Sequence, residues 1–432
     1  MAVAVLLYLP GSAALRGALS LPWGVTLLYA PPVSAGLMAV LTLLFGVSGV
    51  PWTPLTAALT LLAVAVTWVG VELWKRRAET PRRPEAVEGE SGSSPPVSIS
   101  AKTALHALVG SAVFAVSYGW VVLSTVGSPA EVPTVGDAPF HLRAVQLLIE
   151  SRDASPLGPF PSLYPHLDTA PFYPTLWHSL VVPLVGQLSV VEATNVLALF
   201  IGLWVWPMGL AALASSLAPR LPLQALVAPV LAIPFVLMPA IELFGFAVYP
   251  FAISVALLGS TLGLLVHLID RPSKKLVIAF LFAALGVSAG QPTTGLFLLA
   301  AVAIWGLVVL TFRLGTLFKQ GRPWLASAVT VGVVSVIAAA VIAIPKLGIV
   351  RGLNSRGTEF VGVKPALANF LLGPTYFLAG SYLMPALLIA TVAGVLLTVR
   401  FRGNQVIALL GVLLFGMYVA ASGPDSFFRT FT

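Results

Sequence analysis

The feature that most constrains this chain is a succession of apolar runs, each close to the length that crosses a lipid bilayer. A membrane-spanning helix needs about 20 mainly apolar residues. Segments of this kind occur at 33–49, 55–74, 104–124, 190–214, 223–239, 248–268, 276–290, 295–312, 325–345, 381–399 and 405–421, with a shorter one at 2–15. Only 9% of the residues are charged, against roughly 25% in a soluble domain. We therefore predict an all-α polytopic membrane protein with about 11–12 transmembrane helices.

The distribution of Lys and Arg predicts which loops face the cytoplasm. Residues 76–103 are polar, basic and rich in Pro, Gly and Ser, which is typical of a flexible linker. With this linker inside, most cations of the chain fall on cytosolic loops. The large loop 125–187 and the segment 346–380 then lie outside. The sequence predicts N-terminal transmembrane helices over 1–75, the cytosolic linker, and a larger transmembrane unit over 104–432 in the plasma membrane.

The outer loop begins with a pattern that predicts a surface helix and a candidate base. Asp137 precedes Pro139, as expected for a helix N-cap followed by a first-turn proline. The residues that follow predict an amphipathic helix lying on the membrane, with His141 facing the same way as Asp137. His141 is a second catalytic candidate, which would orient the base, donate to a phosphate or help to bind metal. A carboxylate can act as a general base, and a helix N-terminus favours phosphate. The alternative is that Asp137 only caps the helix and His141 is an ordinary surface residue.

The second half of this loop concentrates aromatic and polar side chains. Tyr173 and Trp177 would form either a sugar-stacking wall or an interfacial aromatic belt. His178 would face a cavity or cap a re-entrant turn. Asp168 would contact substrate or simply form a turn.

Further candidates come from outside this loop. Arg351 and Arg356 are expected to bind a phosphate through bidentate hydrogen bonds or to bind anionic head groups. Gln291 would line the cavity or belong to a tight turn, and Glu242 is a further candidate acid. The absence of cysteine excludes thiol catalysis and Cys-ligated metal. No metal ligands are predicted, and use of a divalent cation stays open.

The motifs GDAPFH and YPTLWH together suggest a family. Asp137 and His141 form a D-x-x-x-H element, and Tyr173, Pro174 and His178 form a Y-P-x-x-x-H element. Over residues 104–432 the chain resembles the actinobacterial, cell-envelope subset of membrane glycosyltransferases with the GT-C fold. The resemblance implies a polyprenyl-phosphate-linked sugar donor, an envelope polysaccharide or glycolipid acceptor, inversion at the anomeric carbon, and Asp137 as base. The chain departs from the family at Gly136, where many members carry a second acidic residue.

Two other classes of function compete with this expectation. A transporter or flippase of lipid-linked saccharides would also have many helices and an outer cavity, but its polar groups usually lie on broken helices near the bilayer midplane. A non-catalytic scaffold would bury Asp137 in an ion pair with no cavity beside it. We expect no nucleic-acid partner.

Overall fold

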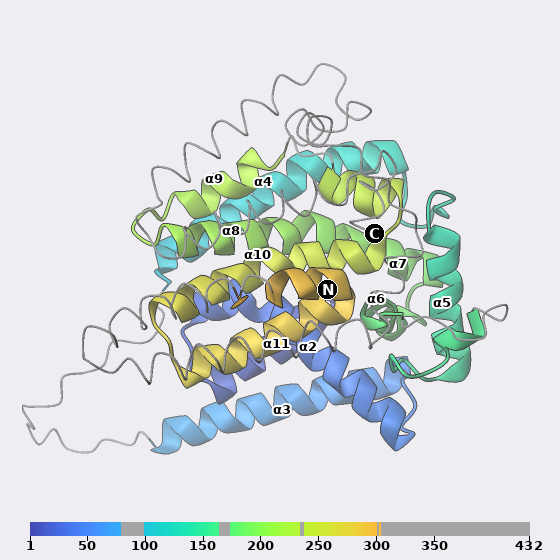
Figure 1. Cartoon of the computed structure of the whole chain (residues 1–432), viewed down its shortest axis with the longest axis horizontal. Coiled ribbons are helices and arrows are strands. Elements are labelled where there is room, and N and C mark those ends of the chain that lie inside the picture. The colour runs from blue at the N-terminus through green and yellow to red at the C-terminus, as the bar shows by residue number, and fades with distance from the viewer. Residues whose placement is uncertain (79–98, 164–172, 234–236, 300–301, 304–432) are drawn as a thin grey trace, which may run out of the picture. The chain divides into compact units, whose positions relative to one another are not determined.

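The computed structural model describes residues 1–78, 99–163, 173–233, 237–299 and 302–303 of the chain (Figure 1). The chain divides into two compact units, Met1–Leu298 and Leu299–Thr432, and the architecture below is that of the first unit. Its regular elements are all helical, as the sequence predicts.

Most helices follow one another with short connections; the longer ones join α3 to α4 and flank α5 and α6. In chain order they are α1 (Ala2–Ser12), η1 (Ala13–Ala18), α2 (Trp23–Ser48), α3 (Pro54–Ala78), α4 (Ala101–Val126), α5 (Ala138–Ser151), η2 (Phe160–Leu163), α6 (Leu176–Val181), η3 (Val182–Leu184), α7 (Val190–Phe200), η4 (Ile201–Val205), α8 (Trp206–Leu217), α9 (Gln224–Leu231), η5 (Leu237–Gly245), α10 (Tyr249–Asp270) and α11 (Lys274–Gly290).

Five helical segments in the described residues are long and apolar enough to cross a membrane. They are Trp23–Ser48, Pro54–Lys75, Ala101–Val126, Val190–Leu217 and Tyr249–Asp270. The protein is therefore an integral membrane protein. The predicted spans 325–345, 381–399 and 405–421 lie outside the described residues, as does most of 295–312.

Two of the expected spans differ from the helices that the structure shows. Helix α2 begins at Trp23, ten residues before the predicted start, and continues through Pro31 and Pro32. Proline is tolerated inside membrane helices because neighbouring helices can satisfy the freed backbone groups. The predicted span 223–239 is not one helix, because α9 ends at Leu231 and Met238 has extended backbone angles within η5.

Close helix contacts in the bundle depend on small residues. Gly36 of α2 lies against the carbonyl of Phe282 on α11, and Gly286 of α11 lies against the carbonyl of Pro32. Small residues allow such close approach in membrane helices, where van der Waals packing replaces the hydrophobic drive. Helix α10 forms the centre of the bundle, with 78% of its apolar window buried, whereas the corresponding fraction for α3 is 6%. Helix α3 therefore lies at the periphery.

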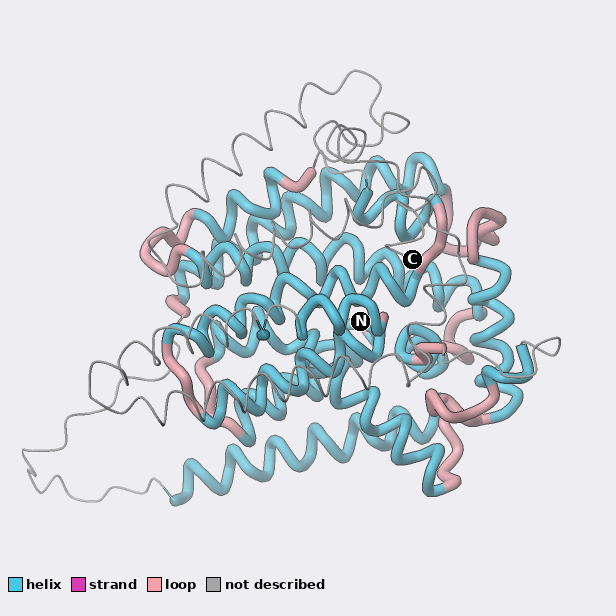
Figure 2. Tube along the Cα trace, in the orientation of Figure 1, coloured by secondary structure: helices cyan, strands magenta, loops and turns pink. Residues whose placement is uncertain are grey.

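Helix α5 does not belong to the bundle and runs across one end of it (Figure 1). It packs on the short helix α6 and on the start of α7. Long loops gather at the same end of the unit (Figure 2). Trp52, between α2 and α3, also lies there, because its backbone amide donates a 2.7 Å hydrogen bond to the carbonyl of Arg152. This end is the one that the charge pattern predicts to face outward.

Candidate functional site

Asp137 occupies a tight turn that is held against the loop between η5 and α10. The backbone amide of Asp137 donates a 2.8 Å hydrogen bond to the carbonyl of Phe246. Gly136, with φ of +54°, packs so closely on Phe246 that a Cβ atom at this position would overlap its carbonyl. No side chain fits at position 136 without a shift of this turn or of Phe246.

The carboxylate of Asp137 is exposed and has no hydrogen-bond or ion-pair partner in the described part of the chain. Asp137 stands at the N-cap of α5, as predicted, but its side chain makes no capping hydrogen bond. It also makes no ion pair with the described residues. The surrounding protein removes part of its water and so raises the pKa of its carboxyl. A free carboxylate with a raised pKa is suited to accept a proton.

His141 faces inward from α5 and meets His178 of α6. Nδ1 of His141 lies 3.0 Å from Nε2 of His178, and the two residues are 1% and 0% exposed. Burial lowers the pKa of His141 to about 3. Burial, then the neighbouring His141, lowers the pKa of His178, while a hydrogen bond with the backbone of Pro174 opposes this shift. Both imidazoles are therefore neutral near pH 7, and the pair joins α5 to α6.

Aromatic rings surround the histidine pair. The Tyr173 ring stacks on Phe160, with centroids 5.3 Å apart, and lies 5.9 Å from the His178 ring. Trp177 stacks on Tyr249 of α10 at 4.7 Å, and Tyr249 lies 5.2 Å from His141. Tyr173, Trp177, His141 and His178, all singled out from the sequence, thus form one cluster. Trp177 is fully buried, so the expected sugar-facing wall is not open at that residue.

Helix α6 is tied to the rest of the unit at Trp52, whose indole nitrogen donates a 3.0 Å hydrogen bond to the carbonyl of Ser179. Two polar atoms in α6 have no hydrogen bond of standard geometry within the described residues, Nε1 of Trp177 and Nδ1 of His178. Buried polar atoms of this kind are uncommon and costly. Helix α6 therefore carries buried polar atoms to which a bound ligand, or a rearrangement of this end of the bundle, would supply hydrogen-bond partners.

Gln291 lies at a break between two helices. Its backbone is extended, with φ of −147°, and a helix resumes at Pro292. Gly290 packs on Ser254 of α10, which places the break near the outer end of α10. Oγ1 of Thr293 is buried without a partner among the described residues. That Gln291 lines a substrate cavity stays a prediction.

Residues of the loop between η5 and α10 were not assigned a role from the sequence. Phe246 holds the Asp137 turn through its carbonyl, and Tyr249 contacts His141 and Trp177. The segment GFAVYP carries a weak signal, since it interrupts an apolar run with two aromatic residues and a proline. That signal does not reveal which distant residues it contacts.

Some predicted site residues lie outside the described part of the chain. These are Asp168, Arg351 and Arg356, together with the outer segment 346–380 and residues 79–98 of the linker. Within the part that is described, no group of three or more His, Asp or Glu side chains could hold a metal ion.

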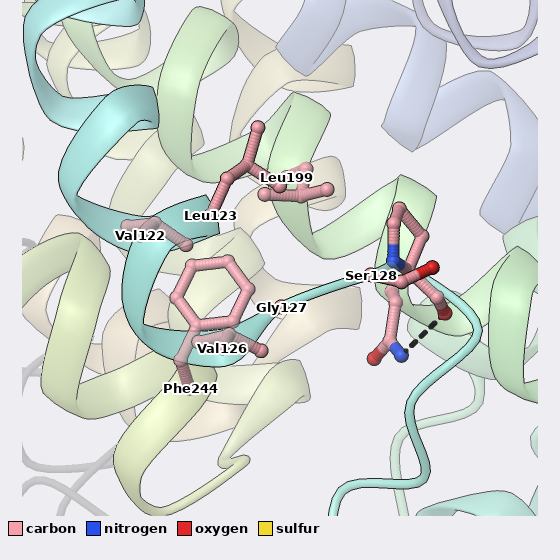
Figure 3. A pocket seen from close by; sticks show the side chains of 9 residues that line it. Val122, Leu123, Val126, Gly127, Ser128, Leu199 and Phe244 are labelled. Atoms are coloured by element: carbon pink, nitrogen blue, oxygen red, sulfur yellow. Dashed lines mark hydrogen bonds between the residues drawn. The ribbon is translucent and has the colours of Figure 1, made fainter.

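A small apolar pocket lies next to this end of the bundle (Figure 3). Its walls come from the end of α4, the following loop, α7 and η5, and include Val122, Leu123, Leu199 and Phe244. Asn195 closes one side, where its amide nitrogen donates a 2.8 Å hydrogen bond to the carbonyl of Pro129.

A family model matches residues 4–432, almost the whole chain. The chain belongs to the DUF6541 family, a family of unknown function. No curated protein and no solved structure matches this DUF6541 member. The match covers both the membrane bundle and the end that carries Asp137, and the family description names no activity, so function is argued from the site.

Proposed function

We propose that the protein transfers a sugar from a polyprenyl-phosphate donor to an envelope polysaccharide or glycolipid acceptor on the outer face of the plasma membrane, with inversion. The observation that carries this proposal is the Asp137 carboxylate. It is exposed, it has no ion-pair partner among the residues that the structure describes, its pKa is raised, and it stands at the N-terminus of a helix that crosses the end of the bundle. The scaffold alternative would require Asp137 to be buried in an ion pair, which is the opposite arrangement.

In the proposed reaction Asp137 takes the proton of an acceptor hydroxyl. The hydroxyl oxygen forms a bond to C1 of the sugar while the bond from C1 to the phosphate oxygen breaks. The phosphate leaves with the bonding electrons, and its charge is favoured by the positive dipole end of α5. Arg351 and Arg356 are proposed to bind the same phosphate, with Gln291 and Asp168 contacting the sugars.

The two histidines support this reaction by position. Since His141 and His178 are buried and bonded to each other, we assign them to holding α5, and therefore Asp137, in place. Tyr173, which is only partly buried beside them, is the aromatic residue of this cluster best placed to contact a sugar ring.

The test is sugar transfer by Asp137→Asn in membranes supplied with lipid-linked donor. We expect a loss of roughly 10²–10⁴-fold, the usual contribution of a general base. Asp153→Asn is the matched control, because Asp153 belongs to the same loop but bonds the backbone amide of Ser155 through its own carboxylate. Unchanged transfer by Asp137→Asn would overturn the proposal.

A transporter or flippase of lipid-linked saccharides is the second candidate. The interruptions at Met238 and Gln291 favour it, since transporters commonly bind ligands at broken helices. The two functions separate in detergent solution, where a bilayer with two faces no longer exists. A transferase still forms glycosylated product there from donor and acceptor, whereas a flippase forms none.

A further inference from the structure

Glu242 on η5 is an acidic side chain that the proposed reaction does not use. It is 8% exposed, and it makes no hydrogen bond or ion pair with the described residues. It lies three residues past the end of the predicted span 223–239. A carboxylate in such surroundings is costly unless it is paired or protonated. Because no described residue pairs with the Glu242 carboxyl, the geometry points to a protonated, uncharged side chain.

Among the described residues, the main elements packed against η5 offer Glu242 no compensating charge. They are η4, which has no titratable residue, and α10, whose nearest titratable side chain is Tyr249. Tyr118 of α4 bonds the backbone of Ala240. Both neighbours are phenols, which are uncharged near neutral pH in their ordinary state. Burial raises the pKa of Glu242 to about 7, with no opposing contribution from a neighbour.

Backbone contacts connect Glu242 to the Asp137 turn. The carbonyl of Glu242 accepts a 2.9 Å hydrogen bond from the amide of Val248, and between these residues the carbonyl of Phe246 accepts the amide of Asp137. Ala247 has φ of +54°, a conformation that a residue other than glycine rarely adopts. A displacement of the Asp137 turn would therefore move the loop that is hydrogen-bonded to the backbone of Glu242.

We propose that Glu242 is a proton-binding site whose occupancy is coupled to the Asp137 turn through residues 245–248. Glu242 is buried in the observed arrangement, and a movement of this loop that brings water to its carboxyl would release the proton. By linkage, a ligand that displaces the Asp137 turn changes the affinity of Glu242 for its proton, and the pH changes the affinity for that ligand. The site does not depend on sugar transfer and serves a transferase or a transporter equally.

Infrared titration of the purified full-length protein tests the proton site. The expected signal is a protonated-carboxyl C=O band that disappears with a midpoint near pH 7, as the pKa of about 7 requires. The band should be missing in Glu242→Gln. Glu150→Gln is the matched control and should keep it, because Glu150 is exposed and ion-paired with Arg143 at 3.2 Å. A band that persists in Glu242→Gln, or that titrates near the ordinary Glu value of about 4.3, overturns the proposal.

The coupling is tested by disturbing the turn without touching either carboxyl. Gly136→Ala forces the turn away from Phe246. Ala247→Gly relaxes the loop and is the test variant to use if Gly136→Ala does not fold. We expect the midpoint of the Glu242 band to shift by about half a pH unit or more. Gly49→Ala should leave it unchanged, because Gly49 also has positive φ but nothing within 4 Å of an added Cβ. An unchanged midpoint in both test variants would disprove the coupling, whereas failure of Asp137→Asn to reduce transfer would concern only the proposed reaction.

Discussion

The carbonyl of Phe246 accepts a hydrogen bond from the amide of Asp137 and at the same time blocks any side chain at Gly136. One backbone group thereby sets both the position of the candidate base and the residue before it. Gly136→Ala should therefore lower activity although it removes no functional group. It should also destabilise the protein by about 1–3 kcal/mol, since it combines a positive φ with a steric clash.

Gly49→Ala is the matched control for that experiment. Gly49 has φ of +70° and open space around it, so alanine there carries the backbone strain without the clash. The comparison is made on thermal stability in detergent and on transfer in membranes. Equal effects of the two substitutions would show that the contact with Phe246 has no special role.

The pairing of His141 with His178 predicts a large loss of stability for His178→Ala. The substitution leaves a cavity and an unpartnered nitrogen on a side chain that is 1% exposed. Together these should lower the free energy of unfolding by about 2–4 kcal/mol, measured as a lower melting temperature. His106→Ala on α4 is the control, because this side chain is only partly buried. A melting temperature no lower than that of the control would argue against the pair as the link between α5 and α6.

The same pair predicts sensitivity to acid. The pKa of His141 falls from 6.5 to about 3 in the folded protein, so below 6.5 the unfolded chain binds protons that the folded chain does not. Stability is therefore present above pH 6.5 and is lost as the pH falls toward 3. The double variant His141→Phe/His178→Phe should show a shallower decline in melting temperature between about pH 7 and pH 5. A decline as steep as in the unchanged protein would contradict this origin.

Local sequence signals predicted α5 well and its surroundings poorly. Asp137 and Pro139 correctly indicated where the helix begins, because the fixed φ of proline acts within a few residues, although the Asp137 side chain makes no capping hydrogen bond. Helical spacing also placed Asp137 and His141 near each other. It did not reveal that His141 is buried, because α6, against which it packs, comes more than thirty residues later in the chain.

The same limit applies to the spans. Hydropathy located the apolar segments, since their length and composition are local properties. It did not predict that α2 would continue through Pro31 and Pro32 or that Met238 would interrupt the segment before Glu242. Whether a proline ends a membrane helix depends on whether neighbouring helices supply hydrogen-bond donors to the backbone carbonyls that the proline leaves unpaired. Those neighbours are distant in sequence.

Trp52 predicts a further effect at a distance from the candidate base. Trp52→Phe keeps an aromatic ring at a position that is 1% exposed but removes the hydrogen bond to the carbonyl of Ser179. The free energy of unfolding should fall by about 1 kcal/mol, seen as a lower melting temperature, because α6 loses a hydrogen bond to the rest of the unit. Trp120→Phe should have little effect, because Trp120 is 78% exposed on α4. Similar losses in the two variants would show that the hydrogen bond is not what stabilises α6.

The raised pKa of Asp137 predicts the acid side of the pH profile for transfer. A general base must be deprotonated, and partial burial raises the pKa of this carboxyl above its ordinary value of 3.8. Activity should therefore fall, as the pH is lowered, at a higher pH than an ordinary aspartate would allow. Initial rates measured across the acid range, in preparations shown to remain folded at each pH, provide the check. Asp153→Asn should keep the same profile, and an acid limb at or below 3.8 would mean that Asp137 is not the group whose protonation limits the rate.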